Sequence, residues 1–208
     1  MAMKLKPIDI QKLESFLDKI AQQTYPEPPT QLHSQITRQM WERVKIEAEV
    51  AADWKILDVG CGQGVALEIF QAEGLTAVGI TLNPEDVKVC QERGFDVRSM
   101  DQSFLDFADG EFQLIWCRRC LEHSIFPFFT LSEFYRVLKP QGFLYVEVPA
   151  PNTSCHHENN PNHYSVLDKS MWVSLINRSG FVIKNVYDVN LATMAGPDTY
   201  WAFTATKI

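Results

Sequence analysis

A glycine-rich segment that directly follows an apolar run is the strongest indication of chemistry in this sequence. Residues 56–64 read Ile-Leu-Asp-Val-Gly-Cys-Gly-Gln-Gly. Glycine lets a backbone turn tightly and approach a ligand without an intervening Cβ. An open α/β sheet places its ligand crevice where such a turn joins a strand to a helix. Asp58, at the strand end, can accept hydrogen bonds from the turn or from a cationic ligand group, so the segment predicts a ligand site.

The spacing of these glycines disfavours a nicotinamide-dinucleotide site. The dinucleotide pattern G-x-G-x-x-G/A needs a small last residue, but that position is Val65 or Leu67, depending on the glycine pair counted. An acidic residue for the ribose is expected about 20 residues further along. Residues 79–82 read Gly-Ile-Thr-Leu, and the next carboxylate is Glu85. A nicotinamide-dependent oxidoreductase is therefore the less favoured interpretation.

The glycine-rich segment and several segments after it resemble, in order along the chain, the motifs of class I S-adenosylmethionine-dependent methyltransferases. The resemblance is to the small-molecule (sugar, quinone and natural-product) type. Residues 57–64 resemble the first motif, residues 79–84 a threonine-containing form of the second strand end, and residues 99–101 the turn that contacts adenine. Further matches lie at residues 112–117, 121–123, 136–143 and 161–181. The resemblance covers residues 54–206, about three quarters of the chain.

This resemblance implies that a methyl group moves from S-adenosyl-L-methionine, as cofactor, to an oxygen, nitrogen or carbon atom of a small-molecule acceptor. Such an in-line displacement mainly needs alignment of donor and acceptor, so the donor motifs contain no universal catalytic residue. The residues expected to bind the cofactor are Asp58, Gly60, Cys61, Gly62, Gly64, Thr81, Leu82, Met100, Asp101, Gln102, Cys117 and Arg118.

Two positions depart from the family pattern. Thr81 stands where family members usually carry a carboxylate for the ribose, and Gln113 replaces the aspartate that usually opens the fourth strand. These departures leave open an alternative, in which the chain is a non-catalytic nucleoside-binding module of the same fold.

The histidines are the candidates for acceptor chemistry. His163 matches a family position near the acceptor, and imidazole can titrate near neutral pH, so His163 is the predicted proton acceptor. His123, together with His156 and His157 in a long polar loop, is expected to contact the acceptor, and Tyr164 to orient it.

No metal site is predicted. The Cys-x-x-Cys pair formed by Cys117 and Cys120 is weak evidence for zinc when it stands alone. Whether the histidine-rich loop binds a divalent ion stays open.

The elements that must position these residues alternate between strands and helices from residue 55 onward. The strand candidates are 55–59, 76–80, 95–99, 113–117, 142–148, 181–188 and 199–206. The helix candidates are 65–72, 84–93, 129–138 and 168–178. This alternation predicts an α/β, Rossmann-like fold with a seven-stranded, mostly parallel sheet. The last two strands should pair antiparallel, because the roughly ten residues between them leave no room for a crossover helix.

Residues 1–50 predict an N-terminal helical appendage that covers a binding domain of residues 51–208. Apolar residues recur at helical spacing between Ile8 and Ile20, with Asp9 as a possible N-cap. A proline-rich turn at 25–29 separates this helix from a second one. Met40 and Trp41 of the second helix are expected to contact the ligand crevice.

Composition excludes several classes of protein. The chain is 46% hydrophobic and 22% charged, as in ordinary globular proteins. A net charge of -7 lowers the expectation of nucleic-acid binding. Five cysteines, an odd number, indicate reduced thiols in a cytoplasmic protein. No run approaches the length of a membrane span, and we expect a monomer or a homodimer.

Overall fold

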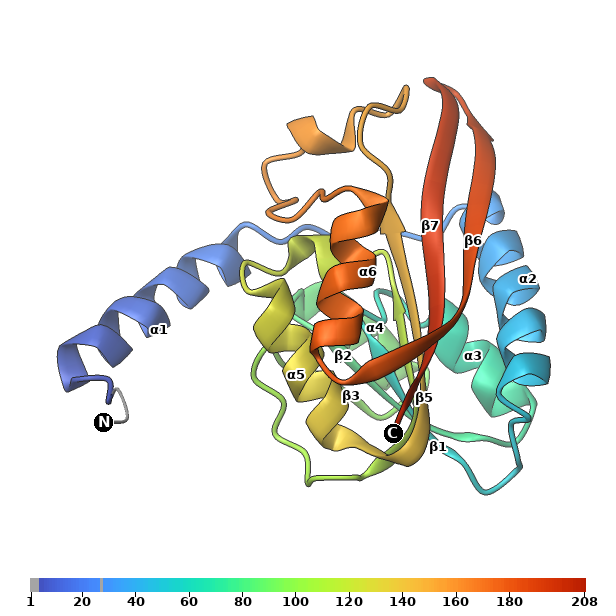
Figure 1. Cartoon of the computed structure of the whole chain (residues 1–208), viewed down its shortest axis with the longest axis horizontal. Coiled ribbons are helices and arrows are strands. Elements are labelled where there is room, and N and C mark those ends of the chain that lie inside the picture. Colours follow the sequence, from blue (N-terminus) through green and yellow to red (C-terminus); the bar gives the residue numbers. More distant parts are fainter. Residues whose placement is uncertain (1–3, 27) are drawn as a thin grey trace.

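A computed structural model, which describes residues 4–26 and 28–208, has a central sheet with helices on both faces (Figure 1). The helices are α1 (Pro7–Gln22), α2 (Gln31–Glu47), α3 (Val65–Ala72), α4 (Pro84–Glu92), α5 (Pro127–Val137) and α6 (Lys169–Arg178), with 3-10 turns η1 (Leu121–His123) and η2 (His157–Asn159). The strands are β1 (Lys55–Val59), β2 (Thr76–Thr81), β3 (Val97–Ser99), β4 (Phe112–Arg118), β5 (Leu138–Pro149), β6 (Phe181–Thr193) and β7 (Gly196–Lys207).

The seven strands lie in the order β3-β2-β1-β4-β5-β7-β6. β1 pairs in parallel with β2 and β4, while β7 pairs antiparallel with both β5 and β6. The prediction of a mostly parallel α/β sheet with an antiparallel C-terminal strand is therefore confirmed. The order reverses at β1, and such a reversal opens a crevice beyond the carboxyl ends of the strands. The glycine-rich segment lies at this point.

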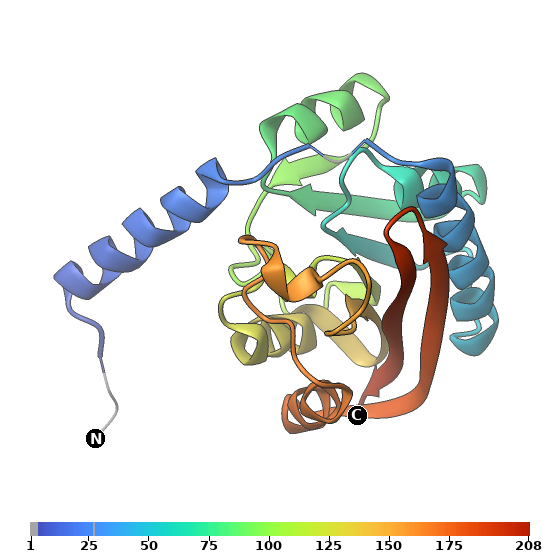
Figure 2. The ribbon, with the colours of Figure 1, turned by 90° about the horizontal axis from the view of Figure 1, so that it is seen from above.

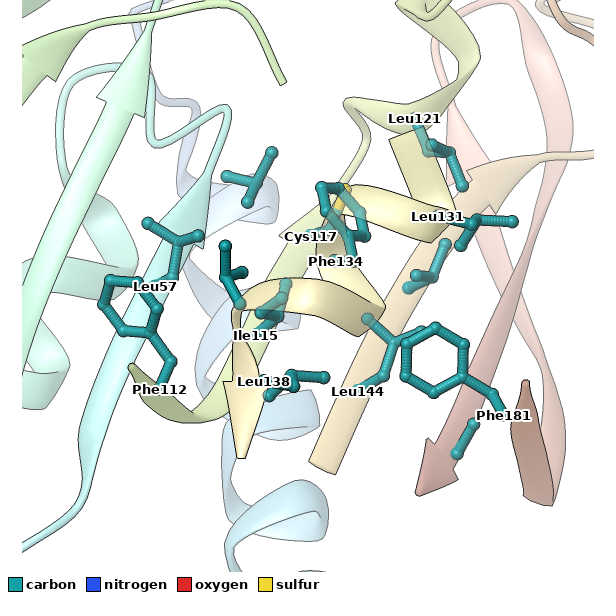
Figure 3. Close-up of a cluster of buried hydrophobic side chains, with 14 of the residues drawn as sticks. Leu57, Phe112, Ile115, Cys117, Leu121, Leu131, Phe134, Leu138, Leu144 and Phe181 are labelled. Carbon is teal, nitrogen blue, oxygen red and sulfur yellow. The ribbon is translucent and has the colours of Figure 1, made fainter. Parts of the chain in front are cut away.

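Alternate strand residues enter two buried layers, one on each face of the sheet. On the face covered by α5 and α6, Leu57 belongs to a cluster with Phe134 (Figure 3). On the opposite face, the Trp116 ring meets Trp41 of α2 edge-on, with centroids 6.1 Å apart, and Trp41 lies 4.7 Å from Phe70 of α3. Because both faces are covered, the central strands β1 and β4 are buried at almost every position.

The expectation that Met40 and Trp41 contact the crevice is wrong. Met40 is 3% exposed and Trp41 is fully buried, and both pack in the core beneath α2. The position of these two residues on a helix before the first strand carries no information about which surface that helix covers. The second helix is thus part of the core.

α1, in contrast, projects away from the rest of the chain (Figures 1 and 2). Ile20 is its one buried residue among those described, while Ile8, Ile10 and Phe16 are exposed. Within residues 4–26 and 28–208, no helix has both the length and the apolar character needed to cross a membrane.

The predicted N-cap of α1 is also wrong. The helix begins at Pro7, after an N-cap at Lys6, and the Asp9 carboxylate accepts a hydrogen bond from the Lys6 backbone N–H (3.1 Å). Proline is favoured at this first position because its missing N–H would have no helical partner there.

The connection between the last two strands is much shorter than expected. Thr193 of β6 pairs with Gly196 of β7, so two residues connect the strands, and Pro197 lies within β7 opposite Ala192. The pairing of β7 with β5 covers residues 200–206. Pro197 therefore lies beyond the end of β5, where its missing N–H breaks no hydrogen bond with that strand.

Candidate functional site

A pocket with a cavity volume of about 160 Å³ lies at the carboxyl edge of the sheet and opens to solvent. The turns after β1, β2, β3 and β4 form its floor, and the end of α1 and the loop after β5 form its walls. The predicted site residues that line it are Gly60, Gly62, Thr81, Leu82, Met100, Asp101, Gln102, His123 and Tyr164.

The glycine turn is fixed to the second strand by its own backbone. The N–H groups of Gly60 and Cys61 both donate to the Ile80 carbonyl, at 2.9 and 3.0 Å. Gly60 has φ +71°, and a Cβ there would lie 2.5 Å from the Cys120 Sγ. Gly62 has φ +49° and open space where a Cβ would be. Glycine at position 60 is therefore required by sterics, whereas at position 62 it keeps the pocket wall open.

Cys61 and Gly64 support the turn and do not line the pocket. Gly64, with φ +82°, is the N-cap of α3, and a Cβ there would lie 3.1 Å from the Cys90 Sγ. Cys61 is 8% exposed, and its sulfur would lie 2.8 Å from a Cβ at Gly79. Both residues therefore allow close packing of α3 and α4 beneath the turn.

Two buried acceptors around this turn have no hydrogen-bond partner. The Asp58 Oδ2 is one of them, and burial, with a smaller contribution from Cys90, raises the pKa of Asp58 to about 8. The other is Gln102 Oε1, since the Gln102 Nε2 donates to the Cys120 carbonyl (2.9 Å). A buried acceptor without a partner costs about 1–3 kcal/mol. Gln102 lines the pocket, so a ligand there that brings an N–H donor would remove this cost at Gln102, whereas Asp58 is buried and does not line the pocket.

The ends of β2 and β3 supply polar groups on one side of the pocket. The Thr81 hydroxyl accepts from the Asn83 N–H (3.4 Å), and Asn83 in turn caps α4. One Asp101 oxygen accepts a backbone N–H two residues further along (2.7 Å). Asp86, on the first turn of α4, lines the pocket beside them. A carboxylate is thus present near Thr81, although it lies on α4 and not at the end of β2, where family members usually carry one.

Cys117 and Arg118 do not face the pocket, and this expectation is wrong. Cys117 is fully buried within the sheet's core (Figure 3). The Arg118 Nε lies 3.0 Å from a Glu147 carboxylate oxygen, and its Nη1 donates to the Thr37 hydroxyl (3.0 Å). Side chains of a buried strand point into the two core layers, and β4 continues to residue 118. The side chains that turn into the crevice are therefore those that follow.

Arg119 and Cys120 are the two residues that follow β4, and both line the pocket. β4 ends at Arg118, one residue later than the predicted strand end at residue 117. The other lining residues that sequence analysis did not single out are Ile20, Thr24, Tyr25, Ile80, Asn83, Asp86 and Asn162.

Three histidine rings, those of His123, His157 and His163, pack together beside the pocket, and of these three only His123 lines it. The His163 Nδ1 lies 2.9 Å from the His157 carbonyl, and the His123 Nδ1 lies 2.8 Å from the Asn162 carbonyl. A carbonyl can only accept, so each of these Nδ1 atoms carries a proton. In the neutral His163 ring, the Nε2 therefore carries the lone pair. The rings of His123 and His163 meet edge-on, with centroids 4.7 Å apart. Burial, followed by the charges of His123 and His157, lowers the pKa of His163 to about 4, so this ring is neutral at pH 7 and the expectation that it titrates near neutral pH is wrong.

His156 and His157, expected to contact the acceptor, do not line the pocket. The His156 side chain is 65% exposed and lies 3.7 Å from Glu158. The His157 Nε2 lies 3.1 Å from the buried Asp198 carboxylate. His157 therefore ties the loop after β5 to β7, and this contact holds the carbonyl that receives the His163 hydrogen bond.

Two groups of described side chains have atoms of the kinds that bind metal ions. The groups are Glu122, His123 and His163, and Cys155, His157 and Asp198; within each group the potential ligand atoms lie within 4.8 Å of one another. The first group borders the pocket through His123, while no member of the second group lines it.

The sequence of this chain is similar to those of known proteins. Residues 57–146 match the family model described as "Methyltransferase domain". The chain is 32% identical over 98 residues to a ubiquinone biosynthesis O-methyltransferase of Thiobacillus denitrificans, covering 44% of this chain and 42% of that protein. It is 31% identical over 151 residues to the 24-methylenesterol C-methyltransferase 2 of Oryza sativa subsp. japonica, covering 68% and 41%.

Among solved structures, the [4+2]-cyclase SpnF shares the fold. It superimposes with a TM-score of 0.71 at 20% identity, over 94% of this chain and 92% of that one. This chain spans about two fifths of the length of the two curated relatives named above.

Proposed function

We infer that this chain, which carries a class I methyltransferase domain, is an enzyme that transfers a methyl group from S-adenosyl-L-methionine to a small molecule. The match of residues 57–146 to the family model described as a methyltransferase domain supports this inference, as does the shared fold. The two matched relatives are named as an O- and a C-methyltransferase. We therefore propose an oxygen, nitrogen or carbon atom of a small molecule as the acceptor.

The observation that carries this proposal is the unsatisfied hydrogen-bonding capacity around the glycine turn. S-adenosylmethionine brings a sulfonium and an ammonium group, ribose hydroxyls and an adenine amino group. Asp58 and Gln102 are buried acceptors without partners, of which Gln102 lines the pocket, and Gly62 leaves open space at the pocket wall. The residues therefore fit this molecule. Thr81 and Asp86 would face its ribose, and Asp101 with Met100 its adenine.

The domain needs to supply alignment, exclusion of water and a place for the acceptor's proton. The sulfonium is already an activated methyl donor, so binding both partners in line supplies much of the rate enhancement. We propose that His163 Nε2 receives the proton of a hydroxyl or amine acceptor. Its Nδ1–H is held by the His157 carbonyl, which orients the lone pair. The contact between His157 and Asp198 makes His157 a positioning residue.

We propose that α1 alone forms the lid that the sequence suggested for residues 1–50. α2 is packed into the core through Trp41, and Arg118 joins it to the sheet through Thr37. α1 has an exposed apolar face, and Ile20 at its end already lines the pocket. Burial of that face over a bound acceptor would exclude water. Slower hydrogen exchange in α1 when S-adenosylhomocysteine and an acceptor bind would support this arrangement, and unchanged exchange would contradict it.

A second candidate function is a nucleoside-binding module of the same fold without methyl transfer. Thr81 offers a single hydroxyl in place of a carboxylate at the second strand end, which favours this candidate. The fold is also found in a protein named as a cyclase, so the fold alone does not determine the reaction. Binding of S-adenosylhomocysteine, with no methylated product from a broad acceptor collection, would favour this candidate.

We further propose a small-molecule partner, no nucleic acid, and a monomer or homodimer in the cytoplasm. The net charge of -7 disfavours a phosphate backbone as a partner. All five cysteines are free thiols, which suits a reducing compartment.

A thermal-shift panel with S-adenosylmethionine, S-adenosylhomocysteine, NAD and NADP tests the cofactor. A ligand at about 100 times its Kd stabilises the native state by about 2.7 kcal/mol. In a protein of this size, that corresponds to a rise of roughly 5–11 °C in Tm. We expect this rise with the two adenosyl compounds alone. Stabilisation by NAD or NADP alone, or by none of the four, would overturn the proposal.

A further inference from the structure

We propose that Arg119 binds an anionic group of the methyl acceptor, such as a carboxylate or a phosphate. This inference rests on the proposed function and specifies the acceptor class for the same pocket. Arg119 was not among the residues that the sequence singled out.

The strand order places Arg119 on the acceptor side of the pocket. Going along the sheet from β3 through β2 and β1 to β4, the pocket is lined by Asp101, Thr81, Gly60 and then Arg119. The nucleoside is proposed to lie over β2 and β3. Arg119 lies at the opposite end, next to β5 and β7, where its guanidinium packs 4.1 Å from the centre of the Tyr200 ring.

Charge is distributed unevenly along this pocket. Among the described residues that line it, Asp86 and Asp101 are the carboxylates, and both lie at the β2–β3 end. Arg119 is the only lysine or arginine among those same lining residues. The acidic end suits the positively charged donor, and the opposite end suits a negative group.

The backbone of Arg119 is held in a strained conformation. Its φ is +54°, in the left-handed region that residues with a Cβ seldom adopt. Its N–H donates to the Glu147 carbonyl (2.8 Å), and its Nε donates to the Glu147 carboxylate (3.2 Å). This conformation turns the chain after β4 and directs the side chain toward β5 and β7. Strain of this kind persists where the surrounding structure fixes it, and it is common at ligand sites.

The guanidinium has hydrogen-bonding capacity that the protein does not use. Arginine carries five N–H donors, but the Arg119 Nη2 is buried and has no partner. Glu147 cannot supply more contacts, because Arg118 and the Tyr145 hydroxyl, at 3.0 and 2.7 Å, also bind its carboxylate. The Arg119 side chain keeps 23% of its surface exposed. An anionic group at this edge of the pocket would complete the donor set.

The methionine part of S-adenosylmethionine also carries a carboxylate, which is an anionic group of the same kind. The test must therefore separate binding of the donor's carboxylate from binding of an anionic group on the acceptor. Protein loaded with S-adenosylhomocysteine already contains that carboxylate. It is titrated with benzoate and with benzamide, which differ mainly in charge, and the Kd of each is measured by NMR. The variants are Arg119→Gln, Arg119→Lys and, as control, Arg178→Gln. Arg178 also packs on an aromatic ring, Phe128 at 4.8 Å, but it is exposed and lies outside the pocket.

We expect the wild-type protein to bind benzoate at least about tenfold more tightly than benzamide, which is about 1.4 kcal/mol. Arg119→Gln should remove this preference while changing the Kd of S-adenosylhomocysteine by less than about threefold. Arg119→Lys should keep part of the preference, because the lysine ammonium is still a positive point charge. Arg178→Gln should keep the whole preference.

Equal binding of benzoate and benzamide by the wild-type protein would overturn the inference. So would an Arg119→Gln variant that loses affinity for S-adenosylhomocysteine and keeps the benzoate preference, since the anion would then be the donor's. If Arg119→Gln does not fold, the inference is tested by the preference of the wild-type protein for benzoate over benzamide and by the reduced preference expected for Arg119→Lys. Failure of the wild-type protein to bind S-adenosylhomocysteine would instead contradict the proposed function.

Discussion

Replacing the glycines of the turn by alanine should separate their two roles. Gly60→Ala should mainly destabilise the fold, whereas Gly62→Ala should mainly weaken cofactor binding. Both residues have positive φ, but a Cβ at Gly60 would lie 2.5 and 2.6 Å from the Cys120 Sγ and Cβ, while a Cβ at Gly62 would meet nothing within 4 Å.

The magnitudes follow from these two environments. An alanine in the left-handed region costs about 1–2 kcal/mol, and an overpacked side chain about 1–3 kcal/mol more. Gly60→Ala should therefore lose about 2–5 kcal/mol of unfolding free energy, and Gly62→Ala about 1–2 kcal/mol. A domain is typically stable by only about 5–15 kcal/mol, so the first loss is easily measured.

Urea unfolding and calorimetric titration with S-adenosylhomocysteine measure the two effects. Gly74→Ala is the matched control, because Gly74 also has positive φ (+75°) and open space, but lies outside the pocket. Gly62→Ala and Gly74→Ala should be equally destabilised, while Gly62→Ala alone should lose about tenfold in affinity, or about 1.4 kcal/mol.

A double variant tests the steric argument directly. Cys120→Gly removes the two atoms that the new methyl group would strike, so Gly60→Ala should cost about 1–3 kcal/mol less in that background. The reasoning is refuted if Gly60→Ala is as stable as Gly74→Ala, or if Cys120→Gly gives no relief.

Three other outcomes are expected. Because burial raises the pKa of Asp58 to about 8, the folded form holds a proton that the unfolded chain releases near pH 4. This contribution to stability therefore falls as pH rises from about 4 to about 8, by up to about 1.4 kcal/mol per unit. In the Asp58→Asn variant, the unfolding free energy of the ligand-free protein, measured with urea, should no longer show this decrease with pH. An unchanged dependence on pH would contradict the raised pKa of Asp58. Arg118→Ala should cost about 3–5 kcal/mol by breaking a buried ion pair, against about 1 kcal/mol for Thr37→Val, measured in guanidinium chloride; similar losses would show that the ion pair is unimportant. With an acceptor in hand, His163→Ala should lower kcat about 100-fold and leave S-adenosylhomocysteine affinity intact, while the exposed His156→Ala changes neither; an unchanged kcat would remove His163 from the proton-accepting role.

Much of the fold was predictable because its signals are local. The strand 55–59 and the helix 65–72 were predicted with the bounds that the structure has. Alternation of apolar runs with helical spacing implies a parallel sheet whichever residues later meet across it. The glycine turn was predictable for the same reason, since three positive φ values within five residues (Gly60, Gly62 and Gly64) demand glycine before any tertiary contact forms.

The errors lie where a residue's role depends on segments far away in the sequence. Trp41 was expected at the ligand crevice, but its packing against Phe70 and Trp116 makes it part of the core. Residues 189–198 were predicted to connect the last two strands, although pairing between β6 and β7 continues through all but two of them.

The sequence by itself determined the order of the elements and the place of the crevice, because backbone preferences and burial periodicity are encoded by neighbouring residues. Only the tertiary structure decided which side chains reach that crevice. The one-residue difference between Arg118, held in the core, and Arg119, turned into the pocket, is set by Glu147 and Tyr200 on other strands. Contacts of this kind leave no pattern in the local sequence, so folding has to bring the strands together before the site is defined.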